Sequence, residues 1–264
     1  MVSTGRVPGT QLYYEVTGAG PPLVLVHSGG FDRRLWDEQF FTFADRYTVI
    51  RYDVRGHGES PPPTKPYSDA EDLYHLLQCL QIEKAHLVGL SLGSTIVIDF
   101  ALAHPEMVEA LILATPEING YTYSAEFTQE FVKLVLSIQE EDGTPAGDLR
   151  LQSPILAPAM ENPTLAQKLR RISRENSRFW LINFVLRRDL FATPPATQRV
   201  AELHAPMLLV VGERQIPDVL NQVRLLEEGV ASVKKVVIPG AGHLVNVEKP
   251  EEFNRTLRDF MSGR

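Results

Sequence analysis

Short apolar runs alternate with amphipathic stretches along the first half of this 264-residue chain. A strand that is buried on both faces reads as a short continuous apolar run, so these runs predict strands. They lie at residues 23–27, 48–52, 85–90 and 108–114, and the β-rich residues 11–16 predict a further strand before them. Helical patterns between them predict helices near residues 35–44, 68–81 and 92–103. This alternation predicts an α/β fold, with a mostly parallel sheet of about eight strands and helices on both faces.

The helix expected at 68–81 carries clear local signals. Ser68 and Glu71 have capping-box spacing, in which each side chain bonds to the backbone N–H of the other residue. The leucines that follow form one apolar stripe, made of Leu73, Leu76, Leu77 and Leu80. The sequence therefore indicates both where this helix begins and which face it buries.

The alternation stops after Pro116 and resumes about ninety residues later. There, strands are expected at 207–212 and 233–238, and helices near 218–228 and from Pro250 onward. The stretch between is helical or irregular in pattern, rich in aromatic residues, and flanked by no linker-like run. We therefore expect one α/β domain over residues 1–264, with a helical cap at 117–200 inserted between core halves 1–116 and 201–264.

Composition narrows the classes of function. Apolar residues make up 44% of the chain, enough for a substantial core. The net charge of −7 argues against a nucleic-acid partner, because such binding needs clustered lysine and arginine. The acidity also disfavours a highly anionic substrate, although one local basic pocket would overrule that. Cys79 is the only cysteine, and the chain shows no signal segment and no long apolar span. The expectation is a cytoplasmic protein that does not bind membranes.

Residues 89–93 read Gly89-Leu90-Ser91-Leu92-Gly93, which matches the pattern G-x-S-x-G. The pattern lies where an expected strand ends and an expected helix begins, the setting in which a sharp turn lifts a serine hydroxyl above the sheet. The helix that follows points its N-terminus at the position of a developing oxyanion. Ser91 is therefore interpreted as a catalytic nucleophile, and the alternative is a simple helix N-cap.

Four motifs in order resemble those of the α/β-hydrolase fold family, in its serine esterase and lactonase branch. They are His27-Ser28-Gly29-Gly30, Asp53-Val54-Arg55-Gly56-His57-Gly58-Glu59-Ser60, the Ser91 turn, and Pro239-Gly240-Ala241-Gly242-His243. The resemblance implies hydrolysis of esters, lactones, amides or related bonds, without a cofactor. It implies an oxyanion hole formed by the N–H of Leu92 and one from the Gly29 region. It implies a structural role for the motif from Asp53 to Ser60.

Ser91 needs a base to take its proton. Seven histidines are available, and His243 follows the strand at 233–238 through a short glycine-rich turn. That position places it at the carboxyl edge of the sheet, together with Ser91. Histidine suits the task because its pKa lies near neutral pH. Structural roles are expected for the others, which include His57, His75, His86, His104 and His204.

The third group of the triad departs from the family. An acid usually follows the seventh strand, but Gln215 stands there, and a neutral amide cannot stabilise an imidazolium in the same way. Some branches place the acid after the sixth strand, where this chain has Glu117, and we favour that residue. The alternatives are Asp218, which also looks like a helix N-cap, Glu213, and no working acid at all. Glu117 could instead be a solvated carboxylate at the mouth of the cap.

Aromatic residues in the expected cap suggest an apolar substrate pocket. The candidates for substrate binding are Trp36, Tyr121, Phe127 and Trp180, with Tyr123, Phe131, Phe179 and Phe184 nearby in sequence. The alternative is that these side chains bury one another.

The leading hypothesis is hydrolysis of a hydrophobic ester or lactone through a Ser91 acyl-enzyme. The alternatives are hydrolysis of a carbon–carbon bond in a diketone-like substrate, and a ligand-binding protein on a hydrolase scaffold. Dehalogenation and epoxide hydrolysis are disfavoured because the turn holds serine in place of aspartate. No metal or cofactor motif is apparent, the expected partner is the small-molecule substrate, and a homodimer is left open.

Overall fold

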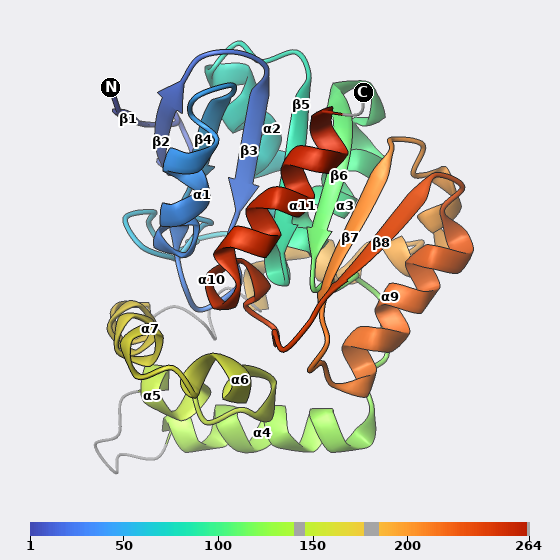
Figure 1. Ribbon diagram of the computed structural model, residues 1–264. Helices are drawn as coiled ribbons and strands as arrows, with labels where there is room; N and C mark the ends of the chain where they lie inside the picture. Colours follow the sequence, from blue (N-terminus) through green and yellow to red (C-terminus); the bar gives the residue numbers. More distant parts are fainter. Residues whose placement is uncertain (140–145, 177–184, 263–264) are drawn as a thin grey trace.

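The computed structural model describes residues 1–139, 146–176 and 185–262 (Figure 1). Its centre is an eight-stranded sheet in the order β1-β2-β4-β3-β5-β6-β7-β8. β2 pairs antiparallel with β1 and β4, and the remaining neighbours are parallel. The strands are β1 (Ser3–Arg6), β2 (Tyr13–Gly18), β3 (Pro22–Val26), β4 (Thr48–Tyr52), β5 (Ala85–Leu90), β6 (Val108–Ala114), β7 (Met207–Gly212) and β8 (Val233–Ile238). The predicted α/β fold is confirmed.

Alternating side chains of the strands divide the core into two layers. In β3, Val24 and Val26 pack into one layer, whereas Leu23 and Leu25 pack into the other, and all four are fully buried. Figure 1 shows α11 crossing the near face of the sheet, with α2 and α3 behind it. The helices of the first layer are α2 (Asp69–Cys79), α3 (Leu92–Ala103) and α9 (Pro217–Gly229). Those of the second include α1 (Asp37–Thr42) and α11 (Pro250–Ser262).

The helix predicted at 68–81 begins where its cap signal indicates. The Ser68 hydroxyl accepts a hydrogen bond from the N–H of Glu71 at 3.1 Å, and the helix then runs from Asp69 to Cys79. The helix expected at 35–44 differs, because it divides into a 3₁₀ turn at Arg33–Trp36 and the short α1. Asp32 starts that turn by accepting from the N–H of Arg34. The cap at Asp32 moves the start of the helical segment toward the N-terminus.

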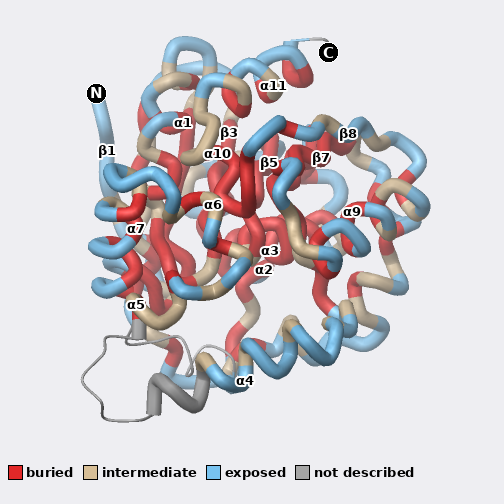
Figure 2. The backbone as a smooth tube through the Cα atoms, turned by 60° about the horizontal axis from the view of Figure 1, so that its bottom comes forward, coloured by how far each residue is buried: buried red, intermediate tan, exposed pale blue. Residues whose placement is uncertain are grey.

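Between β6 and β7 the described residues form helices and 3₁₀ turns, without a strand. Figure 1 shows these helices gathered beyond the end of the sheet to which the β3 and β6 arrows point, and Figure 2 shows α4 as largely exposed. A short α10 (Val245–Glu248) follows β8. The helices before β7 are α4 (Ala125–Gln139), α5 (Ala146–Arg150), α6 (Ala157–Met160) and α7 (Pro163–Glu175). Over the described ranges, no helix has the length and apolar character to cross a bilayer.

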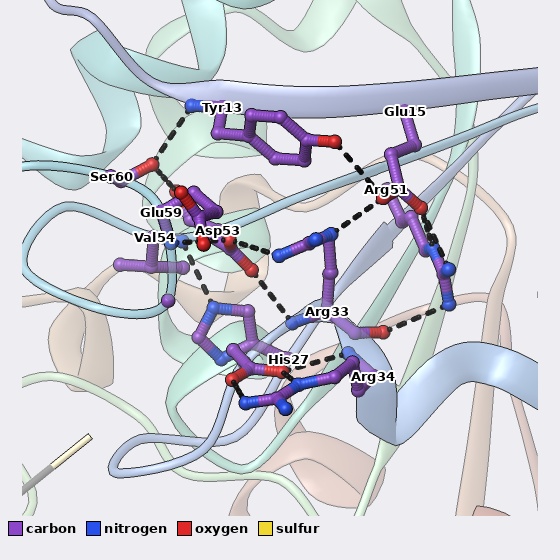
Figure 3. A network of polar contacts seen from close by, with 12 residues as sticks. Tyr13, Glu15, His27, Arg33, Arg34, Arg51, Asp53, Val54, Glu59 and Ser60 are labelled. Carbon is purple, nitrogen blue, oxygen red and sulfur yellow. Dashed lines mark hydrogen bonds and ion pairs between the residues drawn. The ribbon is translucent and has the colours of Figure 1, made fainter. Parts of the chain in front are cut away.

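A buried network of ion pairs fixes the loop after β4 (Figure 3). Asp53 is fully buried and accepts from Arg33 Nη1 at 2.6 Å and from the N–H groups of Arg33 and Glu59, both at 2.9 Å. Arg33 and Arg51 share the Glu15 carboxylate, each at 2.8 Å. Burial raises the pKa of Asp53, and the charge of Arg33 opposes that rise. These contacts give Asp53 a structural role.

The same network sets the loop that follows β3. The N–H of Val54 donates to His27 Nε2 at 2.9 Å, and the N–H of Gly30 donates to His57 Nε2 at 3.0 Å. Burial lowers the pKa of His57 to about 3, so its ring is neutral and can accept that bond. His57 therefore tethers the loop that contains Gly29, and acts as a hydrogen-bond acceptor rather than as a base.

Removing the cation that pairs with Asp53 should destabilise the fold strongly. In Arg33→Met, the Asp53 carboxylate stays fully buried without its guanidinium partner. We expect a loss of about 3–5 kcal/mol in the free energy of unfolding, measured by urea denaturation. The control is Arg6→Met, whose pair with Glu59 is exposed (43% and 62%) and should contribute less than about 1 kcal/mol. Equal losses in the two variants would show that the network is not a stabilising element.

Candidate active site

Ser91 lies at a strained turn between β5 and α3. Its backbone has φ 54° and ψ −115°, which is in the left-handed half of conformational space that a serine rarely adopts. Glycines two residues away on each side make the turn sterically feasible. A Cβ on Gly89 would lie 2.4 Å from the carbonyl carbon of Gly93, and a Cβ on Gly93 would lie 2.1 Å from the Val26 oxygen. Strand packing therefore holds the Ser91 hydroxyl at the carboxyl edge of the sheet.

His243 reaches the same edge from the loop after β8. The Thr115 hydroxyl donates to the His243 carbonyl at 2.7 Å, which ties this loop to the end of β6. The Glu248 carboxylate accepts from the N–H groups of Gly242 at 2.6 Å and Leu244 at 2.9 Å, on either side of the histidine. His243 is only 3% exposed. These hydrogen bonds hold the backbone on both sides of His243, independently of any contact that its ring makes.

Glu117 contacts the nucleophile directly. The Ser91 hydroxyl donates to Glu117 Oε1 at 3.2 Å. The sequence led us to expect this carboxylate on the His243 ring, but Nδ1 of His243 is buried and has no hydrogen-bond partner within the described part of the chain. The two polar side-chain atoms of Gln215 are likewise buried and unpartnered there. The structure therefore brings Ser91, Glu117 and His243 to one cavity, and among the described residues Nδ1 of His243 makes no hydrogen bond to Glu117.

The other two acid candidates have different partners. Asp218 accepts from the N–H and hydroxyl of Ser124, at 2.8 and 2.7 Å, and from the Tyr121 hydroxyl at 3.2 Å. It lies in the first turn of α9, whereas the N-cap is Ile216, so the expected N-cap role is wrong. Glu213 is exposed and accepts from the N–H of Gly240. Neither residue lines the cavity that holds Ser91, whereas Glu117 does.

The two segments expected to form an oxyanion hole adjoin each other. Leu92 is the first residue of α3, and Gly29 follows β3. A Cβ on Gly29 would lie 3.2 Å from Leu92 Cδ2, so the absence of a side chain there allows close packing. Both residues line the cavity beside Ser91. This arrangement places two backbone segments next to the nucleophile, where N–H groups can meet a developing negative charge.

The cavity has a volume of about 510 Å³ and a largely aromatic and aliphatic wall. Its lining includes Tyr121, Tyr123, Phe127, Phe131 and Leu134. Tyr121 and Phe127 thus lie where the sequence placed them.

Trp36 does not belong to this wall. It is fully buried in the core, with its ring 5.9 Å from that of Phe253 in α11, and it does not line the cavity. The expectation that Trp36 binds substrate is wrong because α11 covers the apolar face of this segment. Trp180, Phe179 and Phe184 lie outside the described residues.

Arg150, the last residue of α5, is a site residue that the sequence reading missed. It lines the cavity, and its guanidinium lies 4.8 Å from the centre of the Phe31 ring. Burial lowers the pKa of Arg150 to about 10, and the Glu117 carboxylate opposes that fall. The side chain is therefore still protonated at neutral pH. Nothing in the sequence around Arg150 distinguishes it from a surface arginine.

Arg150 also affects the protonation of the catalytic candidates. Burial lowers the pKa of His243 to about 3, and the positive charge of Arg150 lowers it further. Burial raises the pKa of Glu117 above its ordinary 4.5, while the Ser91 hydrogen bond and the Arg150 charge oppose the rise. Arg150 therefore favours a neutral imidazole and an ionised carboxylate, which are the forms that a base and its supporting acid need.

Removing this charge should shift the pH dependence of catalysis. In Arg150→Met, the pKa of His243 and that of Glu117 should both rise, because Arg150 lowers both. The acid limb of the kcat/KM profile should therefore move to higher pH, whichever group sets it. The measurement is kcat/KM for a neutral ester from pH 4 to 9, with the exposed Arg171→Met as control. An unshifted limb in Arg150→Met would contradict the electrostatic coupling.

Comparison with known proteins places the chain among hydrolases. Residues 23–256 match the sequence model of the alpha/beta hydrolase family. A candidate carbamate hydrolase, RutD of Azorhizobium caulinodans, is 28% identical over 259 residues, covering 94% of each chain. The 2-hydroxy-6-oxo-6-phenylhexa-2,4-dienoate hydrolase of Comamonas testosteroni is 27% identical over 268 residues, covering 96% of this chain and 92% of that protein.

Solved structures of similar size share this fold, and Est816 is one of them. Est816, described as an N-acyl homoserine lactone degrading enzyme, is 26% identical with a TM-score of 0.79. The match covers 98% of this chain and all of the other. In the described residues, no group of histidine, cysteine, aspartate and glutamate side chains could hold a metal ion.

Proposed function

Because this chain belongs to the alpha/beta hydrolase family, we propose that it hydrolyses a carboxylic ester or lactone of a hydrophobic small molecule through an acyl-enzyme on Ser91. One observation carries the proposal: the strained Ser91 turn faces a cavity that is also lined by His243 and Glu117. An apolar wall suits a hydrophobic substrate. The name of Est816 supports a lactone as one such substrate.

In the proposed reaction these groups act in turn. His243 takes the proton of the Ser91 hydroxyl as Ser91 Oγ attacks the substrate carbonyl carbon. The N–H groups of Leu92 and Gly29 stabilise the oxyanion, a contribution of about 3–4 kcal/mol per donor. The intermediate collapses, the C–O bond breaks, and His243 gives its proton to the leaving alkoxide. Water, activated by the same imidazole, then releases the acid and restores Ser91.

Glu117 supports His243 in this scheme. In the structure its carboxylate accepts the hydrogen bond of the Ser91 hydroxyl, while the buried Nδ1 of His243 has no hydrogen-bond partner among the residues that the structure describes. We propose that Glu117 turns to Nδ1 when substrate occupies the cavity, and so stabilises the imidazolium as it forms. A buried imidazolium without a partner would be costly, which is why a charged acceptor matters here.

The helical segment 117–200 acts as a cap in this proposal. It supplies Tyr121, Tyr123 and Phe127 to the cavity wall, across from the strand ends. Such a wall excludes water and sets the size of the acyl group.

Hydrolysis of a carbon–carbon bond is a second candidate, because the Comamonas relative is named for a dienoate substrate. The same cavity groups would serve both reactions.

Trapping the acyl-enzyme tests the proposal. The wild-type protein is mixed with 4-nitrophenyl butyrate, quenched in acid during turnover, and analysed by mass spectrometry. We expect a burst of nitrophenol and a butyryl adduct on the peptide that contains Ser91. Release of nitrophenol with an adduct on another residue, or steady turnover without any adduct or burst, would count against a Ser91 acyl-enzyme. Binding of the ester without any turnover would favour the ligand-binding alternative.

A further inference from the structure

The loop that follows β6 carries Glu117, and one peptide group of this loop is held by side chains from two helices. We propose that Gln222 is a positioning residue, which fixes the backbone of Glu117 so that its carboxylate can serve first the nucleophile and then the imidazole. This role rests on the proposed function and deepens it, because it assigns the placement of the acid to a side chain that does not line the cavity. Gln222 lies in α9 and is fully buried.

Both polar atoms of the peptide bond between Glu117 and Ile118 have side-chain partners. The N–H of Ile118 donates to Gln222 Oε1 at 2.8 Å. The carbonyl oxygen of Glu117 accepts from the Thr95 hydroxyl at 3.2 Å. The N–H and the C=O of a trans peptide point in opposite directions, so α3 and α9 hold this group from opposite sides. Turning the peptide plane would break at least one of the two bonds.

The loop is also anchored on the N-terminal side of Glu117. The N–H of Thr115 donates to the Val210 carbonyl in β7 at 2.9 Å, and its hydroxyl donates to the His243 carbonyl at 2.7 Å. Thr115 has φ +42°, in the left-handed region that a β-branched residue rarely adopts. The backbone is thus held before Glu117 as well as after it. Rotation of the Glu117 side chain is the movement that remains for its carboxylate.

The contact between Glu117 and the nucleophile depends closely on this backbone position. The Ser91 hydroxyl donates to Glu117 Oε1 at 3.2 Å, which is already longer than the usual hydroxyl hydrogen bond of about 2.5–3.0 Å. Burial raises the pKa of Glu117, and the Ser91 hydrogen bond opposes that rise. A displaced carboxylate therefore loses its alignment together with an interaction that keeps it ionised. Displacements of about 1 Å can cost about 100-fold in rate.

The amide of Gln222 suits this role because both of its ends are used. Its Nε2 donates to the carbonyl of Asp218, one turn earlier in α9, at 3.3 Å, while its oxygen faces the loop. A side chain without an acceptor would leave the N–H of Ile118 unsatisfied in a buried position. The loop would then have to move to find another partner, and Glu117 would move with it.

A double-mutant cycle between positions 222 and 117 tests the proposal. Gln222→Met removes the acceptor and keeps the length of the side chain. We expect kcat for 4-nitrophenyl butyrate to fall about 10- to 100-fold. KM should stay within about twofold, because Gln222 does not line the cavity. In Glu117→Gln protein the same substitution should cause no further loss, since a residue that acts through the carboxylate loses its effect when the carboxylate is removed.

Two further variants separate positioning from stability, with a thermal melt of each protein. Thr95→Val removes the donor on the other side of the same peptide, so it should lower kcat in the wild type but not in Glu117→Gln protein. Arg224→Met, exposed on the same helix as Gln222, should match its parent in both backgrounds. A loss from Gln222→Met that is equally large with and without the Glu117 carboxylate would show a purely structural role and overturn the proposal.

Labelling of Ser91 by a fluorophosphonate gives a readout that does not need turnover. Ser91 Oγ forms a bond to phosphorus, the P–F bond breaks, fluoride leaves, and His243 takes the hydroxyl proton. Gln222→Met should slow this labelling about 10- to 100-fold. Labelling at the wild-type rate in that variant would overturn the role of Gln222 and leave the proposed function standing. A wild-type protein that is not labelled at Ser91 would reject both.

Discussion

Replacing Ser91 with alanine should lower kcat for 4-nitrophenyl butyrate by about 10⁶-fold, the loss seen when the nucleophile of a serine triad is removed. The substitution deletes the attacking oxygen and the hydrogen bond to Glu117, while the backbone turn is held by Gly89 and Gly93. The expected change is therefore chemical, and the fold should persist. Nitrophenol release measures the rate, and a thermal melt confirms folding.

A serine far from the cavity serves as the control. Ser232 is exposed, immediately before β8, and Ser232→Ala should keep the wild-type rate. If Ser91→Ala hydrolyses the ester as fast as the wild type, the proposed nucleophile is wrong. If both proteins bind the ester without hydrolysing it, the chain is a binding protein built on a hydrolase scaffold.

Replacing Glu117 with glutamine should lower kcat by about 10⁴-fold, as removal of a triad acid does in other serine hydrolases. Glutamine keeps the shape and can still accept the Ser91 hydroxyl, so the resting contact at 3.2 Å survives. The loss arises when His243 becomes an imidazolium, because the amide cannot neutralise that charge in a buried site. Steady-state kcat on the plateau of the pH profile is the measurement.

The matched control is Asp218→Asn. Asp218 is also a buried carboxylate near the cap, but its partners are Ser124 and Tyr121, and it does not line the cavity. We expect a modest effect on kcat, within about tenfold, and some loss of stability from the weakened hydrogen bonds. A larger kcat loss in Asp218→Asn than in Glu117→Gln would reverse the assignment of the acid.

The parts of the fold that follow from the sequence are those whose pattern reflects burial. The runs at 85–90 and 108–114 correspond residue for residue to β5 and β6, because central parallel strands are apolar on both faces. β1 (Ser3–Arg6) was not expected, since an exposed edge strand that reads STGR has no apolar pattern. The boundary near residue 35 was misplaced because a cap at Asp32, not hydrophobic spacing, determines it.

For the candidate site, too, the sequence predicts positions at strand ends but not those that depend on packing between distant segments. Ser91 and His243 lie at strand ends whose place in the sheet follows from chain order, so the sequence could propose that they meet. Arg150 and Trp36 depend on how helices pack, and helix packing depends on contacts far apart in sequence. The position of Glu117 on Ser91 is a matter of side-chain orientation, which the sequence does not encode locally.

Gly30 and Arg150 lie in segments far apart in the sequence, and their close packing couples the evolution of the two positions. Because the Arg150 guanidinium occupies the place of a side chain at position 30, each residue constrains the other. A cap transplanted from another hydrolase without an arginine here would leave a void over the loop, and a larger residue at position 30 would displace the native cap. Core and cap of this protein are therefore expected to be exchangeable between relatives only when both positions are carried over together.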